Sequence, residues 1–285
     1  MTGQAGTTED LAALSLATGD ARLLVDLDGG IVARWVVADR EIFRPLSENV
    51  SNVLEKPLQS GCFPLAPYCN RIAEGRFAFA GQQHRLPLNF GDHPHAIHGL
   101  AWQRRWTLED RGADHLTIAL SEPAGDWPWA FGVRQTFRLG SNSLDIAIDL
   151  TNRDHRAMPA GLGLHPYFAD PDGGRVEVSA DTVWLTDRSG IPTEKARYPD
   201  GLSTPPDNCL EGWNRRTSII WPGGQLSLSA DGSLNHLHYY RPADADFLCL
   251  EPVSHVPNAI NGAGEPMAVL DPGETLSGTV HMEVQ

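Results

Sequence analysis

Four short segments of this 285-residue chain carry the groups most suited to acid/base chemistry. They cluster polar residues beside aromatics, glycine or proline, and they interrupt an otherwise alternating pattern, as binding loops on a rigid scaffold tend to do. The segments are 67–72 (PYCNRI), 93–99 (HPHAIHG), 163–168 (GLHPYF) and 250–252 (LEP). Together they supply carboxylate, imidazole and guanidinium groups, which can transfer protons or bind hydroxyl groups.

Glu251 and His165 are the two candidates for proton transfer. Glu251 follows the apolar run 247–250 directly, which predicts a carboxylate at or near a strand end, partly shielded from water and able to act as a general base. A glutamate bonded to a turn or an arginine is the alternative interpretation. His165 lies in an apolar setting that favours an imidazole titrating near neutral pH, although a packed core histidine fits the pattern too. If folding brings the two groups together, each charge favours the other.

The remaining polar candidates suit binding better than proton transfer. His93, His95 and His98 raise a metal hypothesis, because His-x-His can place two imidazoles on one face of a strand. We favour a sugar-binding loop, since no glutamate follows the second histidine as a cupin-like site requires. Arg71 stays charged at accessible pH, and its planar donors suit hydroxyls or a ring oxygen, with a surface salt bridge as the alternative. Asp207 follows two prolines and indicates a turn, yet its carboxylate could accept hydrogen bonds from two adjacent hydroxyls.

The elements that position these groups are predicted to be strands. Alternation of apolar and polar residues over 133–139 and 144–150, around Gly-Ser-Asn, predicts a hairpin, and 23–27 with 31–37 around Asp-Gly-Gly predicts another. Further strands are expected at 116–120, 176–178, 226–228 and 280–284. The stretch 40–56 is moderately helix-like but is interrupted by Pro45. We therefore predict an all-β fold of two large antiparallel sheets packed face to face, with few short helices and the strand order left open.

Composition limits the class of protein. A hydrophobic content of 41% supports one large core, so we expect a single domain over 1–285, with residues 1–12 flexible. The formal net charge of −14 argues against nucleic-acid or anionic-membrane partners. The N-terminus lacks a basic leader region and no stretch is apolar enough to cross a bilayer, which predicts a cytoplasmic protein. The four cysteines form no Cys-x-x-Cys pair, so free thiols are expected.

The ordered set of motifs resembles one known family. Residues 70–72 (NRI), 98–99 (HG), 165–168 (HPYF), 207–209 (DNC) and 251–252 (EP) are similar, in this order, to the motifs of the aldose 1-epimerases, whose best-known members are galactose mutarotases. The match spans most of the chain, and its specificity lies in His-Pro-Tyr-Phe followed at long range by a strand ending in Glu-Pro. The resemblance implies a galactose mutarotase-like supersandwich that binds its sugar in an open cleft on one sheet.

The resemblance also implies a role for each matched residue. Glu251 is expected to be the general base and His165 the general acid, while Arg71, His98, Asp207, Asn70 and Tyr167 bind the substrate. The base removes the proton of the anomeric hydroxyl as the acid protonates the ring oxygen, and the open aldehyde recloses after rotation about C1–C2. Tyr167 and the tryptophans are expected to offer apolar faces to the sugar. The implied partner is a monosaccharide, with no cofactor and no metal; the oligomeric state is left open.

Two other functions are compatible with the sequence. One is 1-epimerisation of a hexose 6-phosphate or another anionic sugar, which needs a cationic socket; Arg71, Arg76, Arg104 and Arg105 are available for it. The other is a noncatalytic carbohydrate-binding sandwich. Such a module has no need of Glu251 opposite His165, so that pair distinguishes the two classes.

Overall fold

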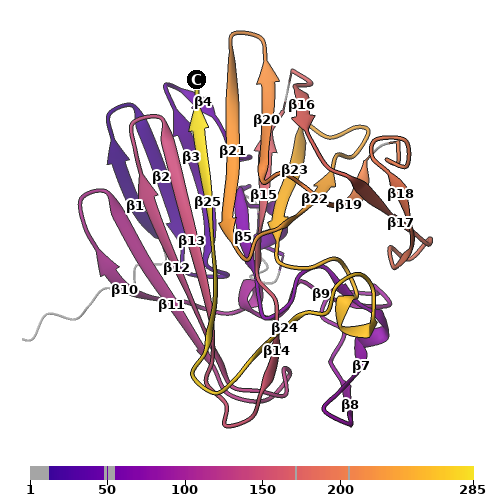
Figure 1. The fold of residues 1–285 in the computed structure, drawn as a ribbon. Helices are drawn as coiled ribbons and strands as arrows, with labels where there is room; N and C mark the ends of the chain where they lie inside the picture. Colours follow the sequence, from indigo (N-terminus) through magenta and orange to yellow (C-terminus); the bar gives the residue numbers. More distant parts are fainter. Residues whose placement is uncertain (1–12, 48–49, 51–54, 171, 205) are drawn as a thin grey trace, which may run out of the picture.

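The computed structural model describes residues 13–47, 50, 55–170, 172–204 and 206–285, and these form an all-β fold (Figure 1). The segment 1–12, expected to be flexible, lies outside the described residues, as do 48–49 and 51–54 of the helix-like stretch. The described part of that stretch contains the short strand Arg40–Glu41 (β4) and no α-helix.

The larger sheet has eleven strands and is antiparallel throughout. Its strands are β1 (Ala13–Thr18), β2 (Ala21–Asp26), β3 (Ile31–Val37), β4, β5 (Cys62–Leu65), β15 (Gly163–Ala169), β17 (Thr182–Thr186), β18 (Pro192–Arg197), β19 (Asp207–Glu211), β22 (His236–Tyr240) and β23 (Phe247–Val253). They lie in the order β1-β2-β3-β5-β15-β23-β22-β19-β17-β18, with β4 paired to β3. Strands far apart in the sequence are therefore neighbours at the centre of this sheet.

The second sheet has eight strands in the order β10-β11-β12-β13-β25-β21-β20-β16. They are β10 (Thr107–Arg111), β11 (His115–Glu122), β12 (Phe131–Leu139), β13 (Ser143–Asn152), β16 (Arg175–Val178), β20 (Arg216–Trp221), β21 (Gly224–Gly232) and β25 (Thr275–Val284). Three two-stranded pairs join β6 (Arg71–Ile72) to β9 (Ala96–Ile97), β7 (Arg76–Phe79) to β8 (Gln82–Arg85), and β14 (Met158–Ala160) to β24 (Ala268–Leu270). The described helices are short 3-10 turns: η1 (Pro57–Gln59), η2 (Ala73–Gly75), η3 (Ala101–Gln103) and η4 (Ala259–Asn261).

Both predicted hairpins are present. Strand β12 pairs with β13 with Val133 opposite Leu150, and alternate residues of both strands are buried. Strand β2 pairs with β3, with a register shift after Leu24 that the alternating pattern did not reveal. The four shorter predicted strands lie within β11, β16, β21 and β25.

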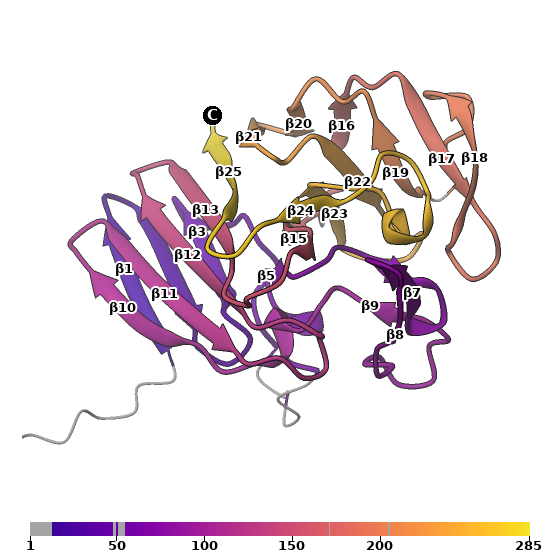
Figure 2. The same cartoon turned by 60° about the horizontal axis from the view of Figure 1, so that its bottom comes forward.

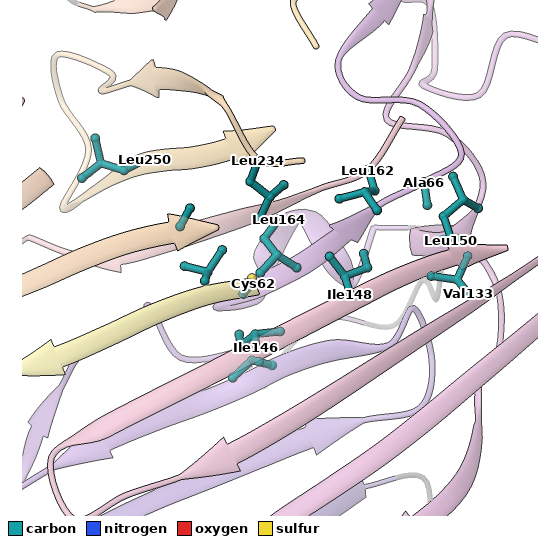
Figure 3. Packing of buried hydrophobic residues seen from close by; sticks show 14 of the residues in the cluster. Cys62, Ala66, Val133, Ile146, Ile148, Leu150, Leu162, Leu164, Leu234 and Leu250 are labelled. Carbon is teal, nitrogen blue, oxygen red and sulfur yellow. The ribbon is translucent and has the colours of Figure 1, made fainter. Parts of the chain in front are cut away.

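The two sheets pack face to face around one apolar layer. Figure 3 shows Ile146 and Ile148 of the second sheet directed toward Cys62 and Leu164 of the larger sheet. A second, smaller cluster, which includes Phe63 and other aromatic residues, covers the opposite face of the larger sheet. That face is where β6 and β9 pair, and β7, β8 and β9 lie together beside the larger sheet in Figures 1 and 2.

The four cysteines are buried and free, as the sequence predicts. None of the described helices has the length and apolar character needed to span a membrane. The larger sheet packs one face against the core, and connecting segments that carry polar residues lie against its other face.

Candidate active site

Four adjacent strands, β15, β23, β22 and β19, form the floor of a cavity of about 240 Å³. The seven residues to which the resemblance assigns a role all line it: Glu251, His165, Arg71, His98, Asp207, Asn70 and Tyr167, whereas His95 does not. The other lining residues are Leu58, Phe90, His93, Ile97, His238 and Tyr240. No tryptophan of the described chain is among them; the aromatic residues of the lining are Phe90, Tyr167 and Tyr240.

His165 and Glu251 face each other across β15 and β23. The register pairs Gly163 with Val253 and Tyr167 with Cys249, which brings His165 opposite Glu251. Nε2 of His165 lies 3.4 Å from Oε1 of Glu251, and the two side chains are 8% and 2% exposed. Nδ1 of His165 and Oε2 of Glu251 have no hydrogen-bond partner among the described residues. Both groups are thus buried and adjacent, and both line the cavity.

Burial moves the two pKa values in opposite directions. It raises the pKa of Glu251 to about 7; Asp207 adds to this rise, while the positive charges of His238 and Arg71 oppose it. Burial lowers the pKa of His165 to about 3, and the charge on His238 acts in the same direction. The expectation that His165 titrates near neutral pH is therefore wrong, because desolvation of the ring dominates. Between these two values the pair carries one proton.

Two aromatic rings pack against the imidazole of His165. Phe63 stacks on it with ring centroids 4.5 Å apart, and Tyr167 stacks with centroids 4.6 Å apart. The guanidinium of Arg44 lies 3.9 Å from the centroid of the Tyr167 ring and donates to the backbone oxygens of Leu58 and Ser60. This stack fixes the ring plane, so that Nε2 remains directed at the carboxyl group on β23.

His238 is the polar residue of the cavity that the sequence reasoning missed. It lies opposite Glu251 in the register of β22 and β23, and its Nε2 is 2.9 Å from Oδ1 of Asp207. Burial alone would lower the pKa of His238, but the carboxylates of Glu251 and Asp207 outweigh burial and raise it. Glu251 therefore has an imidazole on each side. The environment of His238 favours a charged ring, whereas that of His165 favours a neutral one. Two histidines in the five-residue run 236–240 were the available signal.

Asp207 opens strand β19 instead of forming the turn that its two preceding prolines suggested. Its side chain is half exposed. Burial opposes its ionisation, but the hydrogen bond with His238 and the positive charges of His238 and Arg71 together outweigh burial and lower the pKa of this carboxyl. Asp207 is therefore an anionic acceptor at the rim of the cavity.

Arg71, Asn70 and His98 come from the connecting segments that cover the sheet. Asn70 and His98 both have left-handed backbones, with φ of 53° and 60°, and the His98 amide donates to the Asn70 carbonyl over 2.8 Å. The Asn70 side-chain oxygen accepts from Nη1 of Arg71 at 2.9 Å. Burial holds the pKa of His98 well below its usual value, and the positive charge of Arg71 adds to this effect. The site thus contains a neutral imidazole and a fixed cation beside the acid/base pair.

The histidine loop does not gather its imidazoles around one point for a metal. Nδ1 of His93 accepts from the amide of His95, and Nδ1 of His95 accepts from the amide of Glu74. Among the described residues, one group of three has donor atoms within 4.8 Å of one another, and it consists of His165, Cys249 and Glu251. Burial keeps the thiol of Cys249 protonated by raising its pKa well above the usual value, which opposes metal binding there.

The chain is similar to known proteins over most of its length. The profile of the family described as aldose 1-epimerase matches residues 13–283. The chain is 26% identical over 291 residues to the uncharacterized protein YphB of Escherichia coli K12, covering 95% of this chain and 98% of that protein. It is 27% identical over 143 residues to the aldose 1-epimerase of Haemophilus influenzae, covering 46% and 41% of the two chains.

A solved structure supports the fold. The galactose mutarotase-like protein of Clostridium acetobutylicum superposes with a TM-score of 0.85, covering 96% of this chain and 95% of that one at 19% sequence identity. The predicted supersandwich of the galactose mutarotase type is therefore confirmed.

Proposed function

Because this chain belongs to the aldose 1-epimerase family, we propose that it interconverts the α and β anomers of a free, uncharged aldose by acid/base opening and closure of the sugar ring. The observation that carries the proposal is the pair Glu251 and His165, which is buried, 3.4 Å apart and part of the cavity floor. A cavity of about 240 Å³ is small for a ligand site and suits a single sugar ring.

The reaction needs one proton on the pair. Glu251 takes the proton from the anomeric hydroxyl, and Nε2 of His165 gives one to the ring oxygen as the bond between C1 and that oxygen breaks. C1 becomes an aldehyde carbon, and rotation about C1–C2 presents its other face. The steps then reverse, so the proton returns from Glu251 to the carbonyl oxygen and the hydroxyl proton returns to His165. Both groups recover their starting state.

The proton must reach His165 before the ring opens. In the free site its low pKa leaves His165 neutral, and the shared proton rests on Glu251 below pH 7. The two groups are close enough that the ion pair and the neutral pair differ by one short proton transfer. Each such acid or base contributes about a hundred- to ten-thousandfold, which is sufficient for a reaction that water alone already allows.

The other lining residues bind the sugar in this proposal. Arg71 and Asn70 donate to hydroxyls or the ring oxygen, Asp207 accepts from hydroxyls, and neutral His98 can do either. Tyr167 contacts the sugar with the edge of its ring, because His165 and Arg44 pack against the ring faces. A cytoplasmic location and a single domain over 1–285 remain predictions.

The charge of the cavity favours a neutral sugar over a hexose 6-phosphate. Arg71 is the one arginine or lysine in its wall among the described residues. The other arginines considered for a phosphate socket are paired elsewhere: Arg76 with Glu74, Arg104 with Glu122 and Asp126, and Arg105 with Asp28. We therefore expect a higher kcat/KM for glucose than for glucose 6-phosphate.

A noncatalytic sugar-binding role fits the site less well. Burying a carboxyl group with an unpartnered oxygen is costly, and a binding module gains nothing from that cost. A polar residue at a half-exposed position could bind a sugar hydroxyl as well as the buried Glu251 does, without the cost of burial.

Polarimetry of freshly dissolved α-galactose, α-glucose, α-xylose and glucose 6-phosphate tests the proposal. The protein should accelerate mutarotation of at least one neutral sugar, and His165→Asn should lower kcat by about a hundredfold or more with a smaller change in KM. His155→Asn is the matched control, because His155 is 86% exposed. Absence of acceleration for every sugar in the panel, or equal losses in the two variants, would overturn the proposal.

A further inference from the structure

The Arg71 guanidinium has little in its own segment to hold it in place. Its strand, β6, is two residues long, and among the described residues Arg71 has no ion-pair partner. Nη1 donates to the side chain of Asn70, but the buried Nε has no partner. A long side chain of this kind has several rotamers, and binding a sugar requires one of them. Something else must therefore restrict the guanidinium.

The connection between β17 and β18 packs on that guanidinium. A Cβ built on Gly190 would lie 2.6 Å from Cζ of Arg71, 2.7 Å from Nε and 3.0 Å from Nη1. These distances are far below ordinary contact, so the bare Cα of Gly190 rests directly on the guanidinium. Gly190 has a φ of +82°, a conformation that also favours glycine. Gly190 is not among the residues that line the cavity, whereas Arg71 is.

The loop that carries Gly190 is itself firmly built. One side-chain oxygen of Asp187 accepts from the amide and hydroxyl of Ser189, at 2.8 and 2.7 Å, and from the amide of Ile191 at 3.1 Å. The Gly190 amide donates to the Asp187 carbonyl over 3.0 Å. These hydrogen bonds close the turn and fix the backbone of Gly190, so Gly190 cannot move easily to accommodate a different position of Arg71.

We propose that Gly190 is a positioning residue of this site, whose bare Cα covers one face of the Arg71 guanidinium and holds that cation toward the bound sugar. The inference rests on the proposed function, in which Arg71 binds substrate. Gly190 acts only through Arg71. A side chain at position 190 displaces the guanidinium and weakens sugar binding, while Glu251 and His165 keep their positions on β23 and β15.

Steady-state kinetics of Gly190→Ala test the proposal. KM for the best neutral sugar should rise about tenfold, the effect of losing hydrogen bonds from a charged group, with a smaller change in kcat. Gly223→Ala is the matched control, since Gly223 has a φ of +86° and no atom within 4 Å of its added Cβ. It carries the same backbone strain without touching Arg71. An equal rise in KM in both variants would overturn the proposal.

A double variant separates positioning from general damage. In an Arg71→Ala background there is no guanidinium to displace, so adding Gly190→Ala should leave KM unchanged. The same rise with and without Arg71 contradicts the inference. If Gly190→Ala alone melts too early for kinetics, adding Arg71→Ala should restore its melting temperature, because the shortened side chain makes room; no restoration counts against the proposal.

A crystal structure of Gly190→Ala gives a readout independent of turnover. The Arg71 guanidinium should have left its place in the cavity wall. An unmoved guanidinium overturns the positioning role even if the protein proves active. Conversely, a wild-type protein that accelerates none of the sugars counts against the proposed function, whereas a displaced guanidinium would still support the contact between Gly190 and Arg71.

Discussion

Glu251 is the residue whose environment determines most of the expected chemistry. It is a buried carboxyl group with His165 on one side and His238 on the other, and one of its oxygens has no partner. Arg71 and Asp207 are the nearest further charges. The two histidines differ because a hydrogen bond to Asp207 supports a charge on His238, whereas burial dominates at His165 and lowers its pKa. The site is therefore asymmetric about its base.

The pH dependence of kcat/KM follows from this arrangement. Below about pH 7 the pair holds its one proton, and above that value Glu251 loses it in the free site. We expect kcat/KM to be flat from about pH 5 to 7 and to fall as pH rises further. Polarimetry across pH 5–9 measures this profile. A kcat/KM that instead increases through pH 7 would show that the reaction does not need a proton on the pair.

His238→Gln should shift that profile. The positive charge of His238 stabilises the Glu251 carboxylate and so lowers its pKa, and its removal should move the alkaline limb of kcat/KM to higher pH. His236→Gln is a control on the same strand, because His236 does not line the cavity. An alkaline limb at the same pH in wild type and His238→Gln would contradict the electrostatic coupling.

Single residues were predictable here to different degrees. The seven site residues lie in motifs that resemble a known family, and the cavity contains all of them. His238 lies in no such motif, and a histidine in an alternating strand looks like an ordinary core residue. Its partners Asp207 and Glu251 are on other strands of the sheet, so only the pairing of β19, β22 and β23 reveals it.

The strands themselves were the most predictable elements. Alternation is a local signal, so the hairpins β2–β3 and β12–β13 could be read directly from the sequence. The neighbours of β15 could not, because it pairs with β5 on one side and β23 on the other, each far away in the chain. Short pairs such as β6 and β9 contain two residues per strand and leave no periodic signal.

The segment that follows β9 depends on close backbone contact. Gly99 has a φ of +72°, and a Cβ on it would lie 2.0 Å from the carbonyl oxygen of Ala66. Gly99→Ala should therefore destabilise the protein by about 2–4 kcal/mol, from overpacking added to backbone strain. Gly81→Ala, with a φ of +78° and open space around its Cβ, should cost only about 1 kcal/mol. Denaturant unfolding compares the two; equal losses would contradict the packing account.

At the scale of the whole molecule, the buried carboxyl opposes folding. The pKa of Glu251 is about 7 in the folded protein, against 4.5 for the solvent-exposed carboxyl of the unfolded chain. The folded protein therefore retains a proton that the unfolded chain releases between these values, and stability is lost as pH rises through the folded pKa. The proposed reaction requires a buried carboxyl group at position 251, whereas above pH 4.5 that burial lowers the free energy of unfolding.

Glu251→Gln should remove that pH-dependent loss. Raising the pH from 5 to 8 should lower the free energy of unfolding of the wild type relative to this variant by on the order of 2–3 kcal/mol. Denaturant unfolding at the two pH values measures the difference. Glu194→Gln, at an exposed position of β18, should show no such change relative to wild type. A stability gap between wild type and Glu251→Gln that is the same at both pH values would contradict the linkage.

Exchange NMR of an equilibrated neutral aldose tests the central claim most directly, because it observes transfer between the α and β anomeric protons without any coupled reaction. Wild type and the control Glu194→Gln should both produce exchange above the buffer rate, and Glu251→Gln should reduce it by about a hundredfold or more. Exchange that persists undiminished in Glu251→Gln, or that is absent from wild type for every aldose, would contradict the assignment of this site as an acid/base centre for anomer interconversion.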